Sequence, residues 1–176
     1  MIIRDASDAD LTSLTAIYAH HVLKGLGTFE EVPPDTSEMA TRLAAVQGKG
    51  HPWLVAEVDG AIAGYAYAAP FRPRSAYRFS AEDSVYVAPR RIGQGIGRAL
   101  LEALIARCEA AGVRQMVAVI GDSGNTASIA LHRALGFAHA GCLPSIGFKH
   151  GQWVDVVFMC RPLNGGSQTL PGTRGT

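Results

Sequence analysis

Residues 82–111, EDSVYVAPRRIGQGIGRALLEALIARCEAA, decide the fold that we expect for this chain. A short β-branched run, residues 85–87, stops at Pro89 and is followed by a basic turn rich in glycine. Beyond the turn, apolar residues recur at helical spacing from Ile96 to Cys108, and a second strand-like run covers residues 113–120. Strand, glycine turn, helix and strand in this order predict a βαβ unit.

The glycines of this unit stand where its helix begins. A helix N-terminus offers unpaired N–H groups and the positive end of the helix dipole, which suit a phosphate, and glycine lets the main chain approach a ligand closely. The turn therefore predicts a diphosphate-bearing ligand. The dinucleotide fingerprint GxGxxG fails, because Arg98 stands at its third glycine position, and no P-loop pattern occurs. The alternative is a tight strand-to-helix connection without a ligand.

Composition predicts one compact α/β domain within the 176 residues, since 48% of them are hydrophobic. The net charge of +1 gives no reason to expect nucleic acid or a membrane surface as partner. No signal-peptide pattern or membrane-length apolar run occurs, so we expect a cytoplasmic protein. The three cysteines lack CxxC spacing and the histidines lack ligand spacing, so no metal site is expected.

An arginine-rich segment, residues 71–79, precedes the first strand of the βαβ unit. Arg72, Arg74 and Arg78 alternate there with aromatic residues, a pattern that could stack on nucleic acid. Because the chain is nearly neutral, a small anionic substrate suits these arginines better. Surface arginines beside packed aromatics are the alternative. Phe29, in the loop of residues 25–35, is a second candidate for the substrate, or an anchor of that loop.

Three further residues are candidates for chemistry. Glu82 comes immediately before the strand that feeds the glycine turn, where its carboxylate could accept a proton, or it is an exposed residue at a strand end. Asn125 begins a later helix and is either its N-cap or a ligand contact. His132 lies on that helix among apolar residues, with a structural or a chemical role. Residues 137–144 and 153–160 are expected to be the closing strands, joined by residues 147–152.

Two segments resemble motifs of the GNAT superfamily of N-acetyltransferases. Residues 84–104, SVYVAPRRIGQGIGRALLEAL, are similar to motif A, [QR]-x-x-G-x-[GA], in either of two registers. The register with Gly95 and Gly97 places the helix best but puts Ile92 at the usual Gln/Arg position. Residues 124–137, GNTASIALHRALGF, are similar to motif B.

A narrower resemblance, to the phosphinothricin N-acetyltransferase family, runs from about Ile3 to Pro162. The segments TFEEVPP, GYAYAAPFRPRSAYRFSAEDSVYV and GFKHGQWVDV carry it. It implies an α/β GNAT fold, a mixed central sheet of about six to seven strands with splayed central parallel strands, flanked by about four helices. Residues 1–163 would form this single domain, and the composition of residues 164–176 predicts a disordered tail.

The resemblance also implies an activity: transfer of acetyl from acetyl-CoA to the α-amino group of a small amino-acid-like substrate, in a cytosolic homodimer. Glu82 would be the general base and His132 the general acid, although many superfamily members have Tyr at the latter position. Phe29, Arg72, Arg74 and Arg78 would receive the substrate. Acetyl-CoA would be held by Val85, Tyr86, Val87, Gly93, Gln94, Gly95, Ile96, Gly97, Arg98, Asn125 and Ser128.

Two other functions remain compatible with these motifs. The acceptor could be a polyamine, an aminoglycoside or a protein N-terminus, although a cationic acceptor would favour an acidic pocket over the arginine-rich segment. The chain could also be a non-catalytic acetyl-CoA-binding module. The presence of Glu82, a candidate general base, argues against this.

Overall fold

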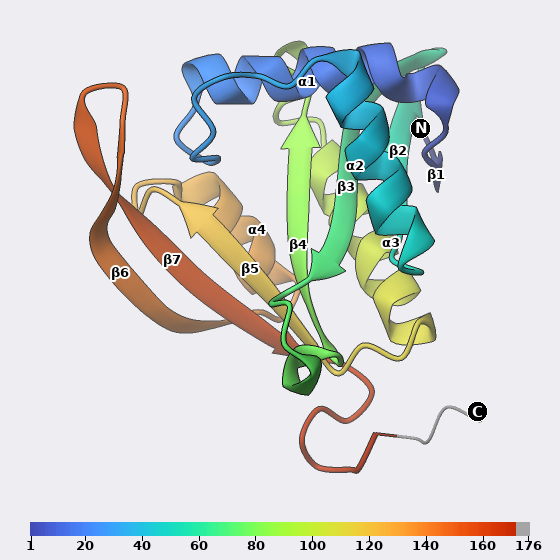
Figure 1. Ribbon diagram of the computed structural model, residues 1–176, viewed down its shortest axis with the longest axis vertical. Helices are drawn as coiled ribbons and strands as arrows, with labels where there is room; N and C mark the ends of the chain where they lie inside the picture. The colour runs from blue at the N-terminus through green and yellow to red at the C-terminus, as the bar shows by residue number, and fades with distance from the viewer. Residues whose placement is uncertain (172–176) are drawn as a thin grey trace.

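A computed structural model of the protein describes residues 1–171. One mixed sheet of seven strands, in the order β1-β2-β3-β4-β5-β7-β6, runs through the molecule (Figure 1). Helices α1 and α2 pack on one face of the sheet and α3 and α4 on the other. The elements are β1 (Ile2–Asp5), η1 (Asp8–Asp10), α1 (Leu11–Lys24), α2 (Thr36–Gly48), β2 (Trp53–Val58), β3 (Ala61–Pro70), η2 (Ser75–Tyr77), β4 (Ser80–Val87), η3 (Pro89–Arg91), α3 (Ile96–Ala110), β5 (Gln115–Gly121), α4 (Thr126–Ala134), β6 (Ala138–Lys149) and β7 (Gln152–Pro162).

Each face of the sheet carries its own apolar core, because successive side chains of a strand point to opposite faces. Leu100, Leu101 and Leu104 of α3 fill the core on one face and are fully buried. On the other face, α1 and α2 pack against stacked aromatic rings of Trp53 and Tyr65. The expected α/β fold with about four helices is thus confirmed, and the sheet has seven strands, the larger of the two numbers expected.

The two central parallel strands separate halfway along their length. Strand β4 pairs with β5 only from Ser80↔Gln115 to Asp83↔Ala118, whereas β5 stays paired with β7 to its last residue. The rest of β4 keeps its partner β3, and no strand within residues 1–171 pairs with its other edge. This confirms the splayed strands, and the opening between β4 and β5 is visible in Figure 1.

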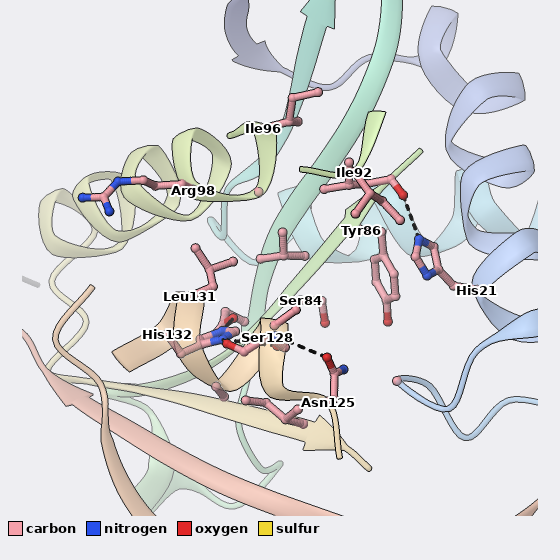
Figure 2. A pocket seen from close by; sticks show the side chains of 18 of the residues that line it. His21, Ser84, Tyr86, Ile92, Ile96, Arg98, Asn125, Ser128, Leu131 and His132 are labelled. Carbon is pink, nitrogen blue, oxygen red and sulfur yellow. Dashed lines mark hydrogen bonds and ion pairs between the residues drawn. The ribbon is translucent and has the colours of Figure 1, made fainter. Parts of the chain in front are cut away.

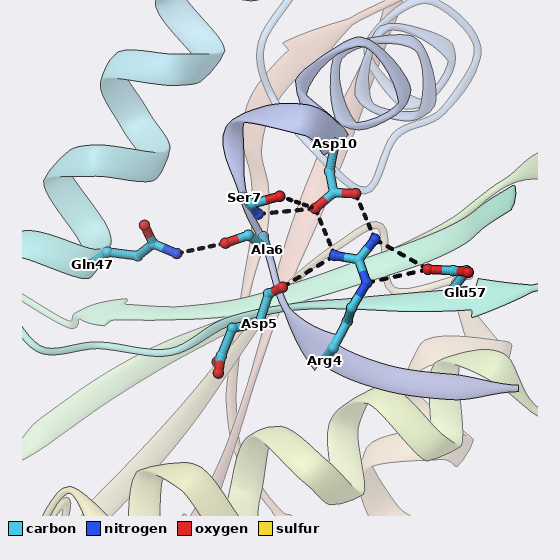
Figure 3. A network of polar contacts seen from close by, with 7 residues as sticks. All are labelled: Arg4, Asp5, Ala6, Ser7, Asp10, Gln47 and Glu57. Atoms are coloured by element: carbon cyan, nitrogen blue, oxygen red, sulfur yellow. Dashed lines mark hydrogen bonds and ion pairs between the residues drawn. The ribbon is translucent and has the colours of Figure 1, made fainter. Parts of the chain in front are cut away.

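A polar network fixes the N-terminal strand to its neighbours (Figure 3). The Arg4 guanidinium donates two hydrogen bonds of 2.8 Å to the Asp10 carboxylate and one of 3.2 Å to Glu57 of β2. The Ser7 N–H also donates to Asp10. The bond from Arg4 is the largest influence and holds the pKa of Asp10 at about 2, although burial acts in the opposite direction.

The last two strands are longer than expected, so the predicted connection over residues 147–152 is wrong. Strand β6 runs to Lys149 and β7 starts at Gln152, which leaves a two-residue turn. His150 and Gly151 both have positive φ there, 50° and 76°, as a tight hairpin turn requires. The glycine and polar residues of segment 147–152 are typical of a loop, which is why the strand ends were placed too early in the sequence.

Residues 164–171 follow β7 and contact the domain, since the Arg114 side chain donates hydrogen bonds to the carbonyl oxygens of Gly166 and Thr169. The remaining part of the tail that we expected to be disordered, residues 172–176, lies outside the described residues. Within residues 1–171, every helix is too short or too polar to cross a membrane.

Candidate active site

A cavity of about 450 Å³ opens where β4 and β5 separate, and residues of α3 and α4 line it together with His21 of α1 (Figure 2). The end of β4, the glycine turn, and the starts of α3 and α4 converge on it. Most of the residues predicted to hold a cofactor therefore come together. Those that line the cavity are Val85, Tyr86, Val87, Gly93, Gly95, Ile96, Gly97, Arg98, Asn125 and Ser128, together with His132.

The glycine turn presents main-chain amides to this cavity. Gly93 and Gly95 have φ of 82° and 78°, the left-handed region in which glycine is favoured, and Gly95 directly precedes α3. No side chain of the described part of the chain caps α3, and no acidic residue lies in its first turn. The first N–H groups of α3 thus lack helical acceptors, and an anion is the partner that they suit. This geometry fits the diphosphate of acetyl-CoA.

Strand β4 offers main chain to the cavity only at alternate residues. The backbone hydrogen bonds from Ala88 to Ala63 and from Phe71 to Ser80 show that the even-numbered residues of β4 bond to β3. The N–H and C=O groups of Val85 and Val87 therefore face the opening, whereas those of Tyr86 do not. The Val87 carbonyl accepts a hydrogen bond of 2.9 Å from His21 Nε2 of α1, a residue that the sequence analysis did not single out.

The start of α4 supports the opposite wall of the cavity. The Asn125 side chain accepts a hydrogen bond of 3.2 Å from the Ser128 N–H, so Asn125 is the N-cap of α4 (Figure 2). Both residues also line the cavity. The two roles considered for Asn125 are thus compatible, since the cap fixes its side chain at the cavity wall.

His132 lies at the base of the cavity in a buried ion pair. Its Nδ1–H donates to the Ser128 carbonyl at 2.8 Å, and its Nε2 lies 2.9 Å from Asp83 Oδ2. Burial lowers the pKa of His132, but the hydrogen bond and charge of Asp83 and the bond to Ser128 outweigh it, so the net pKa is raised. Asp83 is not among the residues predicted from the sequence. Its alternation with apolar Ala81 and Val85 was the signal that this carboxylate lies on the buried face of β4.

Glu82 lies on the other face of the sheet from Asp83, one residue before β4 and β5 separate. It does not line the 450 Å³ cavity. Its carboxylate is half-buried and lies 3.9 Å from Arg72 Nη1. Burial raises the pKa of Glu82, Arg72 lowers it, and the net direction is upward. A carboxylate of this kind can accept a proton at the edge of the opening.

The remaining predicted residues lie away from the cavity. Arg74 is exposed at the start of η2, and Arg78 lines a second cavity, with Lys49 and Val113. Gln94 donates a hydrogen bond of 3.3 Å to the Arg90 carbonyl. Phe29 packs over Gly147 of β6, where an added Cβ would lie 2.2 Å from its ring. The three arginines therefore do not form one cluster, and only Arg72 contacts Glu82.

The loop between α1 and α2 is held beside the opening by polar contacts. Lys149 of β6 is buried and donates a hydrogen bond of 2.6 Å to the Thr28 carbonyl. Glu30 accepts hydrogen bonds from Tyr18 at 2.8 Å and from Arg42 at 2.7 Å. These contacts fix the loop so that Gly27 forms part of the cavity wall.

Comparisons with known proteins agree with this geometry. Residues 15–137 match the model of the acetyltransferase (GNAT) family. The chain is 61% identical to a phosphinothricin N-acetyltransferase of Alcaligenes faecalis, over 96% of this chain and 86% of the relative. It is 43% identical to an L-methionine sulfoximine/L-methionine sulfone acetyltransferase of Pseudomonas paraeruginosa, over 89% of this chain and 91% of the relative.

A solved structure is also very similar. A GNAT superfamily phosphinothricin acetyltransferase from Sinorhizobium meliloti, in complex with AcCoA, superposes with a TM-score of 0.96 at 52% identity. The match covers 98% of this chain and 94% of that one. The chain therefore belongs to the GNAT family, and it is an acetyl-CoA-dependent N-acetyltransferase.

Proposed function

We propose that the enzyme acetylates the α-amino group of a small amino-acid-like acceptor of the phosphinothricin, methionine sulfoximine or methionine sulfone type. The names of the two curated relatives support this acceptor class. The observation that carries the proposal is the Glu82–Arg72 pair at the opening, because it combines a proton acceptor with a cation that suits a carboxylate.

Acetyl-CoA supplies the activated acetyl thioester, and the cavity offers the groups to hold it. In this proposal the amides at residues 93–98 bind the diphosphate, with Arg98 adding positive charge. Gln94 is the member of that turn that does not line the cavity. The main chain of Val85 and Val87 bonds the pantetheine arm as an extra strand would. Asn125 and Ser128 contact the end that carries the thioester.

Glu82 acts as the general base in this proposal. An α-amino group is mostly protonated near neutral pH and must lose its proton before it can attack a carbonyl. Glu82 lies beside the gap between β4 and β5, on the sheet face that α1 and α2 cover. The cavity proposed for the thioester opens at the same gap, so the acceptor and the thioester meet there. The partial burial that raises the pKa of Glu82 makes it a stronger base.

Arg72 binds the acceptor's carboxylate in this proposal. Its guanidinium lies over the Phe71 ring, 4.3 Å from the ring centre, and its Nη1 donates a hydrogen bond of 2.9 Å to the Phe71 carbonyl, which limits its movement. The side chain is nevertheless half exposed. Phe29, Arg74 and Arg78 stay predicted substrate contacts, and Arg72 has the strongest geometric support among the four.

A homodimer is also part of the proposal. The β6–β7 hairpin extends past the rest of the sheet in Figure 1, and β6 is an edge strand. Ile146, Phe148 and Trp153 expose apolar side chains on it. Unpaired strand edges with exposed apolar side chains favour association with another chain. Light scattering would give the mass of a dimer for the wild-type protein and of a monomer if this part is wrong. The cytoplasmic location stays a prediction.

The test of the acceptor class is release of free thiol from acetyl-CoA with a panel of amines. The panel contains phosphinothricin, methionine sulfoximine, methionine sulfone, common amino acids, a polyamine, an aminoglycoside and a short peptide. A blank without acceptor is needed, because the exposed Cys142 reacts with thiol reagents too. We expect turnover concentrated on the first three compounds. Turnover confined to the polyamine, the aminoglycoside or the peptide would replace our acceptor by one of the alternatives.

A further inference from the structure

The Asp83 carboxylate has an unusual environment for a charged group. It is 6% exposed on the face of β4 that α3 and α4 cover, and it lines the proposed acetyl-CoA cavity. Its Oδ2 lies 2.9 Å from His132 Nε2. Its Oδ1 is buried and has no hydrogen-bond partner among residues 1–171. A buried carboxylate oxygen without a donor is costly, so a donor from the cavity is expected there.

The hydrogen bonds of His132 determine where its protons lie. The Ser128 carbonyl can only accept, so Nδ1 must carry a proton. Nε2 faces a carboxylate oxygen, and a contact of 2.9 Å between them is favourable only with a proton in between. The pair therefore holds one proton between Asp83 and His132 in addition to the one on Nδ1.

We propose that Asp83 is a positioning residue for His132, and that the pair keeps this proton for the sulfur of CoA as it leaves. The inference rests on the acetyl transfer proposed above. When the C–S bond of the thioester breaks, its electron pair stays on sulfur, and the proton of the pair moves to sulfur directly or through one water. An acceptor that arrives as the ammonium ion loses two protons, one before its nitrogen attacks and one as the new C–N bond forms, and each passes to Glu82 and then to solvent. The pair regains one proton from solvent, so each turnover releases one proton overall.

The other groups around the pair do not supply this proton. Cys108 approaches Asp83 from α3, and burial, with Asp83 as the second cause, raises the pKa of its thiol to about 12, so it stays neutral. Phe137 presents its ring at right angles to the His132 ring, 5.0 Å away between centres. Glu82 is the neighbouring charge on β4 but lies on the opposite face of the sheet.

The test compares Asp83→Asn with Glu82→Gln, because both remove one negative charge from adjacent residues of β4. NMR titration of the His132 ring is recorded without substrate in the wild type and both variants, with His132→Gln to assign the signal. We expect His132 in the wild type to titrate above the ordinary value of 6.5. Asp83→Asn should lower its midpoint by at least about one pH unit, whereas Glu82→Gln should leave it unchanged. A wild-type midpoint at or below 6.5, or one that Asp83→Asn does not lower, would overturn the proposal.

A second readout separates a chemical role from a structural one. Activity that needs the protonated pair falls as pH rises, so the high-pH limb of kcat should move to lower pH in Asp83→Asn by the same amount as the NMR midpoint. A limb that does not move would overturn the role in catalysis. Asp83→Ser, which is smaller and also neutral, serves if Asp83→Asn does not fold. If the wild type acetylates no amine, the acetyl transfer fails, while the titration still tests the pair.

Discussion

Replacing Gly97 with alanine separates binding of acetyl-CoA from stability of the fold. Gly97 is the second residue of α3 and lines the cavity. A Cβ there would lie 3.5 Å from side-chain atoms of Val87 and Leu131, an ordinary van der Waals distance, so the protein itself accommodates the methyl group. The methyl group would nevertheless stand between the helix N-terminus and a diphosphate.

The expected magnitudes follow from these contacts. Alanine is favoured over glycine in a helix by about 0.5–1 kcal/mol, so Gly97→Ala should unfold at the wild-type temperature or about 1–4 °C above it. A hydrogen bond to a charged group contributes about 1.5–3 kcal/mol. Displacing the diphosphate from even one amide should therefore weaken acetyl-CoA binding at least about tenfold.

Gly60→Ala is the matched control. Gly60 has φ of 75° in the β2–β3 turn, lies outside the cavity lining and has open space where a Cβ would be. Strain in the left-handed region should cost about 1 kcal/mol of stability and leave acetyl-CoA binding unchanged. Calorimetric titration with acetyl-CoA and thermal unfolding measure both quantities. Wild-type affinity in a well-folded Gly97→Ala would refute the assignment of this turn to the diphosphate.

Four further changes test other parts of the account. Glu82→Gln should lower kcat by on the order of 10²-fold with unchanged acetyl-CoA affinity, and wild-type kcat would remove Glu82 from the mechanism. Arg72→Ala should raise KM for carboxylate-bearing acceptors and move the acid limb of kcat/KM to higher pH, because Arg72 lowers the pKa of Glu82; an unchanged KM would exclude it from the acceptor site. Gly147→Ala should cost about 1–3 kcal/mol of stability, because the added methyl group would overlap the Phe29 ring. The cost should be much smaller in a protein that also carries Phe29→Ala, and equal costs would contradict the contact between Phe29 and Gly147. The folded state favours the ionised Asp10 carboxylate, whose pKa of about 2 lies below its ordinary value. As pH falls from about 4 to about 2, the unfolding free energy of the wild type should therefore drop by about 2 kcal/mol more than that of Asp10→Asn. A difference between the two proteins that does not change with pH would contradict this.

The βαβ unit was predictable because its signals are local. Helical spacing, glycine next to the helix start and the break at Pro89 all act within a few residues, and the structure has α3 beginning at Ile96 as expected. The two-residue turn at His150 and Gly151 was missed, since positive φ at a histidine gives no clear signal in the sequence.

The cavity was predictable in part for the same reason. The glycine turn and the cap of α4 are local features, whereas the Asp83–His132 pair joins residues 49 positions apart and depends on how α4 packs on β4. In the arginine-rich segment, closeness in the sequence was wrongly taken to predict closeness in the fold. Arg72 and Arg78 are close in sequence, but η2 between them directs one toward Glu82 and the other to a second cavity.

Methionine sulfoximine carries two nitrogens, so the position of the new acetyl group on it shows whether the enzyme acetylates an α-amino group. The measurement is NMR of the product formed from 13C-labelled acetyl-CoA, which identifies the nitrogen that bears the acetyl group. We predict a single amide at the α-amino nitrogen, with one CoA released for each acetyl group transferred. Acetyl on the sulfoximine nitrogen, or hydrolysis of acetyl-CoA without any acetylated product, would contradict it.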